Sequence, residues 1–536
     1  MHDSPLPRRS ALRFLGAIPV AAGLAATASR ADAGSYPGSP RTAPAQLPPA
    51  GAAADPALDA RIREIMNRDT FQGARWGMTF HVPGSAEPIY RHLGDELFPA
   101  GSTVKYFLSA IALAALGPAS RFRSEVFRTG PVRHGTLHGD LVLVAGGDLL
   151  MGGRVQPDGR LALPDPDHAN NLPEASPLPG DPLRTLRLMA RQVASAGVRR
   201  VTGRVLVDTS LFRAGRERIA LGALEVPVTP IMVNDNVVDV VARPGSHVGA
   251  PAVLNVSPDF GYLRVDNQVV TGPASDAPAR PLTFTDDVMR PDGTRDVRLT
   301  GEVSLSRTHS FACYYLPDPV LFAAMALRHA LECTGVRVPP GATGTYTGER
   351  PDRLLARHVS PPVSEAVKVM SNIHSAYWPY LVGAIAGGDP ETAKATGKAM
   401  QRRLQEDAGL DPGHPDNGRY TADYYVQFLS YVARQNYYQP FHDLLAVMGR
   451  SGSLAHVQVG SPAAGSVFAK AGHVAGLSLG TALAGYIEPP GRPAIAFSQY
   501  LEKPQIPSDD MKRFWDLGTE AQGEVVTAVW ERVVSS

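Results

Sequence analysis

Ser102 and Lys105 could together form an activated serine nucleophile. They stand three residues apart at the start of a predicted helix, Tyr106 to Leu116, and therefore share one helix face. A serine hydroxyl needs a nearby base, and an amine can be that base once burial lowers its pKa. Only 7 of the 52 basic residues are lysines, and a lysine can lose its proton where an arginine cannot. Taken alone, the pair fits an N-capping serine beside a solvated lysine equally well.

A second lysine of interest lies near the C-terminal end of the chain. Lys470 falls in a predicted strand, Val467 to Ala471, and Gly472 and His473 follow it. A glycine at such a place allows a ligand or a second backbone segment to approach closely. The segment is therefore a candidate wall for a binding cleft.

The elements that must position these residues change in character along the chain. Helical patterns and a few strands fill the beginning and the end, whereas the middle consists of short β-branched runs separated by Gly, Pro, Asp and Asn. This order predicts one α/β domain interrupted by a β-rich insertion. Further helices are predicted at Pro56 to Arg68, Pro182 to Ala196, Pro319 to Cys333, Ser364 to Ala386, Glu391 to Asp407, Ala422 to Met448 and Asp509 to Val534, and strands at Trp76 to His81, Ile89 to Arg91, Leu477 to Ile487 and Ala494 to Gln499.

Composition limits the possible partners. With 536 residues and a net charge of +1, the chain is large enough for several cores and has no global field that would favour nucleic acid. Its two cysteines, Cys313 and Cys333, exclude a disulfide framework and a Cys-only zinc site. They flank a predicted helix about 22 Å long, so two free thiols are favoured over a bridge.

The N-terminus resembles an export signal. Arg8 and Arg9 precede an apolar run, and small residues around Ala33 suit a signal peptidase. Residues 1–33 are predicted to be a cleaved signal, with a twin-arginine or an ordinary secretory type both open, and residues 34–56 a Pro/Ala/Gly-rich linker. An uncleaved anchor is the alternative. This signal predicts that the protein is exported to the periplasm or the cell envelope. No later segment predicts a membrane span.

Several motifs together resemble the D-alanyl-D-alanine carboxypeptidase/endopeptidase family of penicillin-binding proteins, the low-molecular-mass class with a large insertion. Ser102-Thr-Val-Lys105 resembles the nucleophile motif of this family, and Lys470-Ala-Gly472 resembles its Lys-Thr-Gly element. The resemblance covers nearly the whole mature chain. The remaining segments that support it are His138 to Asp148, Gly203 to Asp208, Val233 to Asn236, Ser451 to Leu454, Pro462 to Gly465 and Gly485-Tyr486.

Two motifs depart from the family pattern. The middle motif, Ser-x-Asn, corresponds to Ser371-Asn372-Ile373, so an isoleucine stands where the asparagine is expected. An isoleucine side chain forms no hydrogen bond, and Asn372 or His374 would have to replace that function. In the third motif Ala471 replaces a hydroxyl residue that in the family helps to hold the substrate carboxylate. Each loss predicts a roughly ten- to hundredfold lower rate, and inactivity does not follow.

The resemblance implies an α/β fold of the penicillin-binding-protein/β-lactamase-like transpeptidase type, an antiparallel sheet flanked by helices with a large, mainly β insertion. It places the transpeptidase-like domain at residues 57–131 and 356–536 and the insertion at 132–355. It also implies an exported serine carboxypeptidase/endopeptidase that acts on peptidoglycan peptides and that β-lactams inhibit covalently. No cofactor or metal is expected.

The resemblance likewise implies the roles of the site residues. Ser102 would be the nucleophile, Lys105 its base, and Ser371 a proton relay. Substrate binding would fall to the set Asn372, Lys470, Gly472 and His473.

Other interpretations remain open or are disfavoured. A catalytically impaired homologue that binds peptidoglycan or a partner without turnover is the main alternative, and an esterase or β-lactamase-like hydrolase is a third. His134 and His138 lack the glutamate of a His-Glu-x-x-His zinc motif. Asn234-Asp235-Asn236 is more typical of a turn than of a calcium loop. The aromatic residues Tyr424, Tyr425, Phe428 and Tyr431 have the spacing of a helix face packed in a core.

Overall fold

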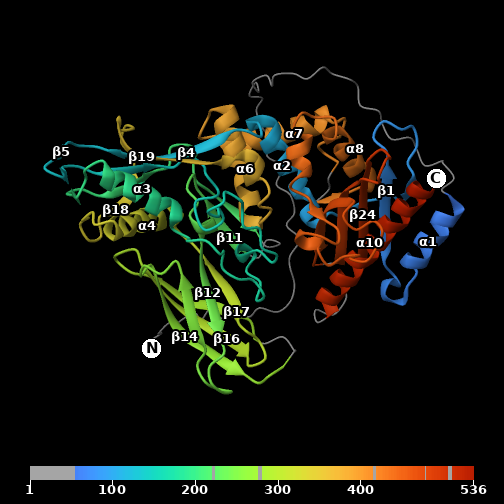
Figure 1. Ribbon diagram of the computed structural model, residues 1–536, viewed down its shortest axis with the longest axis horizontal. Coiled ribbons are helices and arrows are strands. Elements are labelled where there is room, and N and C mark those ends of the chain that lie inside the picture. Colours follow the sequence, from blue (N-terminus) through green and yellow to red (C-terminus); the bar gives the residue numbers. More distant parts are fainter. Residues whose placement is uncertain (1–54, 220–223, 276–279, 415–417, 477, 505–509) are drawn as a thin grey trace, which may run out of the picture.

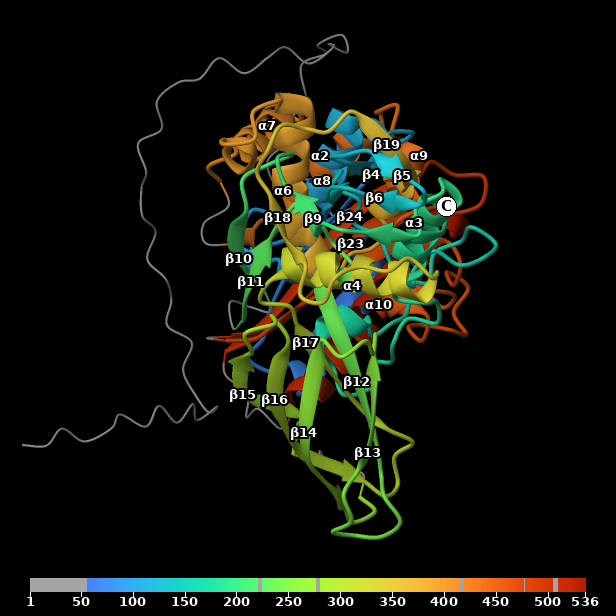
Figure 2. The ribbon, with the colours of Figure 1, turned by 90° about the vertical axis from the view of Figure 1, so that its left-hand side faces the viewer.

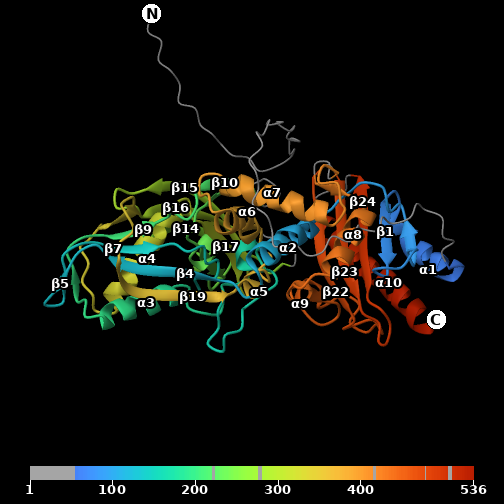
Figure 3. The ribbon, with the colours of Figure 1, turned by 90° about the horizontal axis from the view of Figure 1, so that it is seen from above.

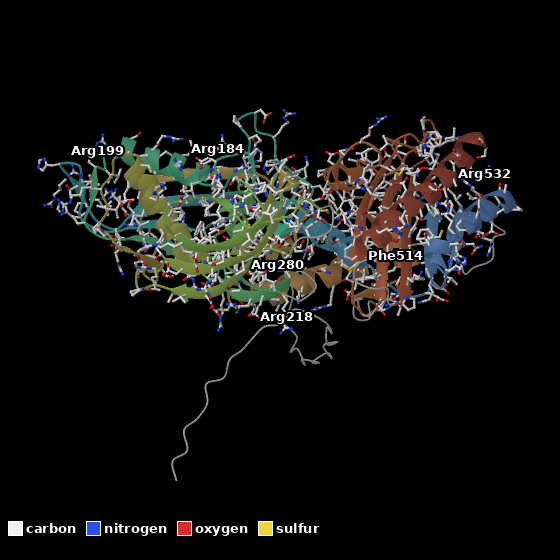
Figure 4. The ribbon with its side chains drawn as sticks, turned by 90° about the horizontal axis from the view of Figure 1, so that it is seen from below. Arg184, Arg199, Arg218, Arg280, Phe514 and Arg532 are labelled. Atoms are coloured by element: carbon white, nitrogen blue, oxygen red, sulfur yellow. The ribbon has the colours of Figure 1, made fainter. Side chains whose placement is uncertain are left out.

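The computed structural model shows an elongated molecule with two ends of different architecture (Figure 1). It describes residues 55–219, 224–275, 280–414, 418–476, 478–504 and 510–536. The predicted signal, residues 1–33, and nearly all of the predicted linker lie outside the described residues. Arg532 lies near one end of the molecule, and Arg199 lies near the other (Figure 4).

A six-stranded antiparallel sheet forms the first end, with the strand order β2-β1-β24-β23-β22-β21. Its central strands are apolar on both faces, because alternate residues enter two different cores. In β23, Ala482, Ala484 and Tyr486 face one core, whereas Leu479 and Leu483 face the other. The strands are β1 (Arg75–His81), β2 (Tyr90–His92), β21 (Ala446–Val447), β22 (Val467–Val474), β23 (Ser478–Ile487) and β24 (Ile495–Pro504).

Helices cover both faces of this sheet. On one face, α1 (Pro56–Met66) and α10 (Met511–Ser535) bury a stripe of Leu, Ile, Phe and Val side chains. On the other, α2 (Lys105–Leu116) and α8 (Ala422–Val432) pack Phe107 against Phe428, with ring centroids 4.4 Å apart. Tyr424, Tyr425 and Phe428 are buried there, which confirms the predicted core face.

Two long helical predictions are interrupted in the structure. The predicted helix from 364 to 386 is divided into α5 (Val363–Ala366) and α6 (Asn372–Gly387). The predicted helix from 422 to 448 ends at Val432 and is followed by the short α9 (Tyr438–His442) and by β21. The first break has a clear physical reason, because Ser371 takes an extended conformation and caps the new helix.

The insertion forms the second end of the molecule. Its main sheet has the order β18-β9-β7-β4-β19, and α3 (Arg184–Ser195) and α4 (Pro319–Cys333) pack against it in one hydrophobic core. The strands are β4 (Arg121–Arg128), β7 (Leu141–Val144), β9 (Val205–Asp208), β18 (Thr343–Tyr346) and β19 (Arg353–Pro362). Because β4 and β19 belong to this sheet, we propose that the insertion begins and ends with these two strands.

Smaller sheets complete the insertion and project from it (Figure 1 and Figure 2). Their strands range from two residues in β5 to ten in β14 and β16. They are β5 (Val132–Arg133), β6 (Thr136–Leu137), β8 (Arg200–Val201), β10 (Gly215–Ile219), β11 (Leu224–Val228), β12 (Val237–Arg243), β13 (Val253–Ser257), β14 (Leu263–Gly272), β15 (Thr283–Met289), β16 (Arg295–Ser304) and β17 (Ser310–Tyr315).

Two features bear on the environment of the protein. Cys313 is buried in β17 and Cys333 is exposed at the end of α4, and both are free thiols. Among the described residues, none of the helices combines the length and apolarity needed to cross a bilayer.

Helices α2 and α6 lie between the sheet and the insertion (Figure 3), and α7 (Ala393–Asp407) packs closely on α6. Two glycines permit this approach. A Cβ atom on Gly383 would lie 1.7 Å from the carbonyl oxygen of Ala393, and one on Gly397 would lie 1.9 Å from that of Pro379. The packing of α6 therefore depends on the absence of side chains at this contact.

We expect Gly383→Ala to destabilise the fold, although the same change in an isolated helix gains about 1 kcal/mol. The two helices would have to separate, and overpacking of this kind costs about 1–3 kcal/mol. Urea unfolding followed by circular dichroism measures the change. Gly460→Ala is the control, because a Cβ atom there meets nothing within 4 Å. An unchanged unfolding midpoint for Gly383→Ala would contradict the close packing of α6 and α7.

Candidate active site

Ser102 lies at a junction between a short strand and a helix, as the sequence predicts. β3 (Phe98–Pro99) leads into the 3-10 turn η2 (Gly101–Val104), which continues directly into α2. The turn is fixed because Tyr106 Oη donates a hydrogen bond of 2.5 Å to the carbonyl oxygen of Ala484 in β23. Ser102 itself is half-buried at the start of this turn.

Lys105 is withdrawn from solvent beside this serine. Its side chain is only 9% exposed, and Nζ donates a hydrogen bond of 2.7 Å to the carbonyl oxygen of Met370. Burial, and then the positive charge of Lys470, lower the pKa of Lys105 to about 7, although Asp167 acts in the opposite direction. A substantial fraction of this amine is therefore neutral at pH 7 and able to accept a proton.

The strand β22 passes directly beside Ser102. A Cβ atom on Gly472 would lie 2.8 Å from the backbone nitrogen of Ser102, and one on Gly101 would lie 3.0 Å from the backbone nitrogen of His473. Gly101 also has a φ of +53°, a region that favours glycine. Glycine on both sides thus brings the Ser102 and His473 backbones together, the arrangement from which two N–H groups can stabilise an oxyanion.

The other residues of the Lys470 segment have distinct surroundings. Lys470 Nζ donates a hydrogen bond of 2.8 Å to the carbonyl oxygen of Ala471, and burial lowers the pKa of Lys470. The exposed His473 stacks on Trp515 of α10, with ring centroids 5.1 Å apart. The surrounding protein, and then Lys470, lower the pKa of His473 to about 4, so its ring is neutral at pH 7.

The middle motif reaches Lys105 through its backbone. Ser371 is 2% exposed, and its Oγ accepts a hydrogen bond of 3.3 Å from the backbone nitrogen of His374, which caps α6. Met370, whose carbonyl oxygen binds Lys105, immediately precedes it. The half-buried Asn372 begins α6. The structure therefore brings Ser371 and Asn372 to the same region as Ser102 and Lys105.

The two departures from the family pattern are both buried among apolar side chains. Ile373 is 1% exposed in the core around α2 and α6, and Ala471 is 5% exposed in the core beneath α10. His374 is fully buried and its Nε2 lies 2.8 Å from Asp235 Oδ1, so its side chain does not reach the cleft. His374 therefore does not replace the polar function missing at position 373, which leaves the half-buried Asn372 as the candidate.

A cluster of buried charged residues, which was not predicted from the sequence, lies near the middle motif. Asp167, His168 and Asp235 have ligand atoms within 4.8 Å of one another, a spacing that could suit a metal ion. Arg154, however, forms ion pairs with Asp235 at 2.5 Å and with Asp167 at 2.8 Å. Arg154 already pairs with both carboxylates and His168 pairs with Asp235, so the cluster is better described as an ion-pair network than as a metal centre.

The fold of the chain is that of the penicillin-binding proteins. Its structure is similar to penicillin-binding protein 4 from Haemophilus influenzae, with a TM-score of 0.64, 16% identity, and coverage of 88% of this chain and 99% of that one. The same protein complexed with a β-lactam gives a TM-score of 0.63 at 16% identity and covers 88% of this chain and 98% of that one. At this identity the similarity establishes the fold.

Sequence comparison identifies the family. The model of the D-Ala-D-Ala carboxypeptidase 3 (S13) family matches residues 58–516, and the chain belongs to this family. It is also 28% identical over 483 residues to a D-alanyl-D-alanine carboxypeptidase from Actinomadura sp., a match that covers 82% of this chain and 79% of the relative. The family predicted from the sequence motifs is therefore confirmed, and so is the predicted α/β fold class.

We expect Lys105 to titrate far below an ordinary lysine, which has a pKa of about 10.4. Reductive methylation with ¹³C-formaldehyde followed by NMR across pH 5 to 11 should show that the labelled amine of Lys105 titrates with a midpoint of about 7. The Lys105→Arg variant assigns the signal by losing it. If the signal assigned to Lys105 titrates at the ordinary value, the amine is not desolvated as the structure indicates.

Proposed function

We propose that the protein is an exported serine D-Ala-D-Ala carboxypeptidase/endopeptidase that cleaves peptidoglycan peptides through an acyl-enzyme. Membership of the D-Ala-D-Ala carboxypeptidase 3 family supports peptidase chemistry on the cell wall. The observation that carries the proposal is the contact of Gly472 with the Ser102 backbone beside a buried amine whose pKa lies near 7. Export rests on residues 1–33 of the sequence.

The proposed reaction assigns one step to each group. Ser102 Oγ attacks the carbonyl carbon of the penultimate D-alanine while Lys105 Nζ accepts the hydroxyl proton. The backbone N–H groups of Ser102 and His473 stabilise the oxyanion. The peptide C–N bond then breaks, and the proton passes to the leaving amine through Ser371. Water hydrolyses the ester and regenerates Ser102.

Substrate binding in this proposal depends on the strand edge. Lys470 provides positive charge for the terminal carboxylate, Gly472 allows β22 to approach the Ser102 backbone, and Asn372, next to Ser371, contributes a polar side chain. The hydroxyl that the family uses at position 471 is absent, so the carboxylate is held by fewer hydrogen bonds. β-Lactams are expected to acylate the same serine, because they present a strained amide to it.

A fluorescent penicillin should form a covalent adduct on Ser102. We expect stoichiometric labelling of the mature protein, with the mass shift in the peptide that contains Ser102, and no labelling of Ser102→Ala. Ser109→Ala is the matched control, because Ser109 lies on the same helix and is 3% exposed. Labelling that survives in Ser102→Ala would refute the assignment of the nucleophile.

A homologue that binds peptidoglycan without turnover is the second candidate, favoured by the apolar residues Ile373 and Ala471. The two candidates differ in the release of D-alanine from a pentapeptide substrate. We expect slow but measurable release by the unaltered protein, reduced at least roughly a hundredfold in Lys105→Ala because no neutral amine accepts the serine proton. Lys398→Ala is the control, since Lys398 lies on α7.

The outcome decides between turnover and scaffolding. Release by the unaltered protein that disappears in Lys105→Ala excludes a scaffold. No release, together with intact binding of peptidoglycan, would favour the scaffold. Hydrolysis of nitrocefin or simple esters without release of D-alanine would instead identify a β-lactamase-like hydrolase or an esterase.

A further inference from the structure

A buried ion-pair network joins the insertion to the middle motif. His168 lies between two carboxylates, with Nε2 2.5 Å from Asp235 Oδ2 and Nδ1 2.8 Å from Asp239 Oδ1. Arg154 Nε donates to Asp235 at 2.8 Å. The second oxygen of Asp235 lies 2.8 Å from His374 Nε2 on α6. Asp235 is thus the point at which three segments of the chain meet.

The basic and acidic side chains of this network pair with one another in the protein interior. Arg154, His168, Asp235, Asp239 and His374 are each at most 2% exposed. Burial disfavours a charged imidazole, but Asp239 and Asp235 outweigh it and raise the pKa of His168 to about 10. Burial likewise opposes the charge on Asp235, yet Arg154 and His374 hold its pKa well below the usual range. Removal of one member leaves a buried charge without its partner, so the network resists local rearrangement.

The turn that carries Asp235 is strained, and its side chains hold it in place. Asn234, Asp235 and Asn236 have φ values of 50°, 52° and 54°, three consecutive left-handed residues that are not glycine. Such a conformation persists only where the surroundings determine it, and it is common at functional sites. Asn236 Oδ1 accepts a hydrogen bond of 3.1 Å from the backbone nitrogen of Val233, which closes the turn.

The same turn holds α6 at two points. Asp235 binds His374, and Asn236 Nδ2 donates a hydrogen bond of 2.7 Å to Tyr377 Oη. His374 and Tyr377 are three residues apart and therefore lie on one face of the first turns of α6. Just ahead of these contacts lie Ser371 and the carbonyl oxygen of Met370 that binds Lys105.

We propose that the Asn234–Asn236 turn positions the start of α6 and, with it, Ser371 and the acceptor of Lys105. His374, Asp235 and Asn236 are positioning residues, which do not touch the substrate. Ile373 is buried in the core and forms no side-chain hydrogen bond. The polar contacts that hold the start of α6 therefore come from the turn, through Asp235 and Asn236. The inference rests on the proposed function for its effect on rate, and on the structure alone for its effect on the order of α6.

The test uses two substitutions of one histidine in the full mature chain. His374→Leu removes the contact with Asp235, whereas His374→Gln retains a donor that can reach it. His358→Leu is the matched control, because His358 Nε2 lies 3.0 Å from the buried Asp148, and neither residue belongs to α6 or to the Asn234–Asn236 turn. Tyr377→Phe, which removes only the hydroxyl contacted by Asn236, provides a second and milder variant.

Two measurements separate the inference from the proposed function. Stopped-flow acylation by penicillin gives the binding constant and the acylation rate constant separately. We expect His374→Leu to lower the acylation rate constant roughly a hundredfold, as a misplacement of about 1 Å does, with the binding constant little changed and with partial recovery in His374→Gln. Hydrogen exchange followed by mass spectrometry should show faster exchange of the backbone amides in 371–378 for His374→Leu and, to a smaller degree, Tyr377→Phe.

Each outcome decides a different question. Equal exchange in 371–378 for His374→Leu and for His358→Leu overturns the inference, as does an unchanged acylation rate constant in His374→Leu. If the unaltered protein forms no adduct at all, the proposed function fails, and the exchange measurement still decides whether the turn positions α6.

Discussion

The arrangement of the site depends on keeping one lysine amine out of water beside a serine hydroxyl. Lys105 can serve as a base only while its surroundings disfavour the ammonium form, and that requires protein atoms on every side. Its hydrogen bond to Met370 places this amine against the segment that precedes α6, and the charge of Lys470 on β22, the strand that runs along η2, also acts on it. A single acceptor, the carbonyl oxygen of Met370, satisfies it without adding a charge.

Local patterns were sufficient to predict the elements that carry the nucleophile. The helix after Ser102, the helix α4 and the three C-terminal strands are mostly apolar runs, so their presence follows from the sequence, although β22 and β24 extend beyond the predicted bounds. The break between α5 and α6 does not. Residues 367–371 are compatible with a helix, and the chain leaves that conformation because Ser371 caps α6 and Lys105 takes the carbonyl oxygen of Met370. The hydrogen bond from Lys105 forms between distant parts of the chain, so the helix propensity of residues 367–371 does not predict where the helix breaks.

The charged network shows a second limit of sequence reasoning. Arg154, His168, Asp235 and His374 are up to 220 residues apart, and no spacing rule connects them. The one local signal was Asn234-Asp235-Asn236, three residues that tolerate a left-handed backbone, and this indicated a turn without its partners. Conversely, the sequence showed that Ile373 and Ala471 replace polar residues, but only their burial reveals that each has become part of a core.

These two observations have a common physical explanation. In a compact site, polar contacts at the middle motif both bind substrate and restrain the helix that carries the serine. Here the contacts that hold α6 come from Asp235 and Asn236 of the insertion, while Ile373 contributes only apolar packing. The Asn234–Asn236 turn therefore holds α6 in place, whereas substrate binding is left to other segments of the chain. An asparagine restored at position 373 would meet apolar neighbours and leave a buried amide unpaired, so the family's polar pattern cannot be recovered by one substitution without loss of stability.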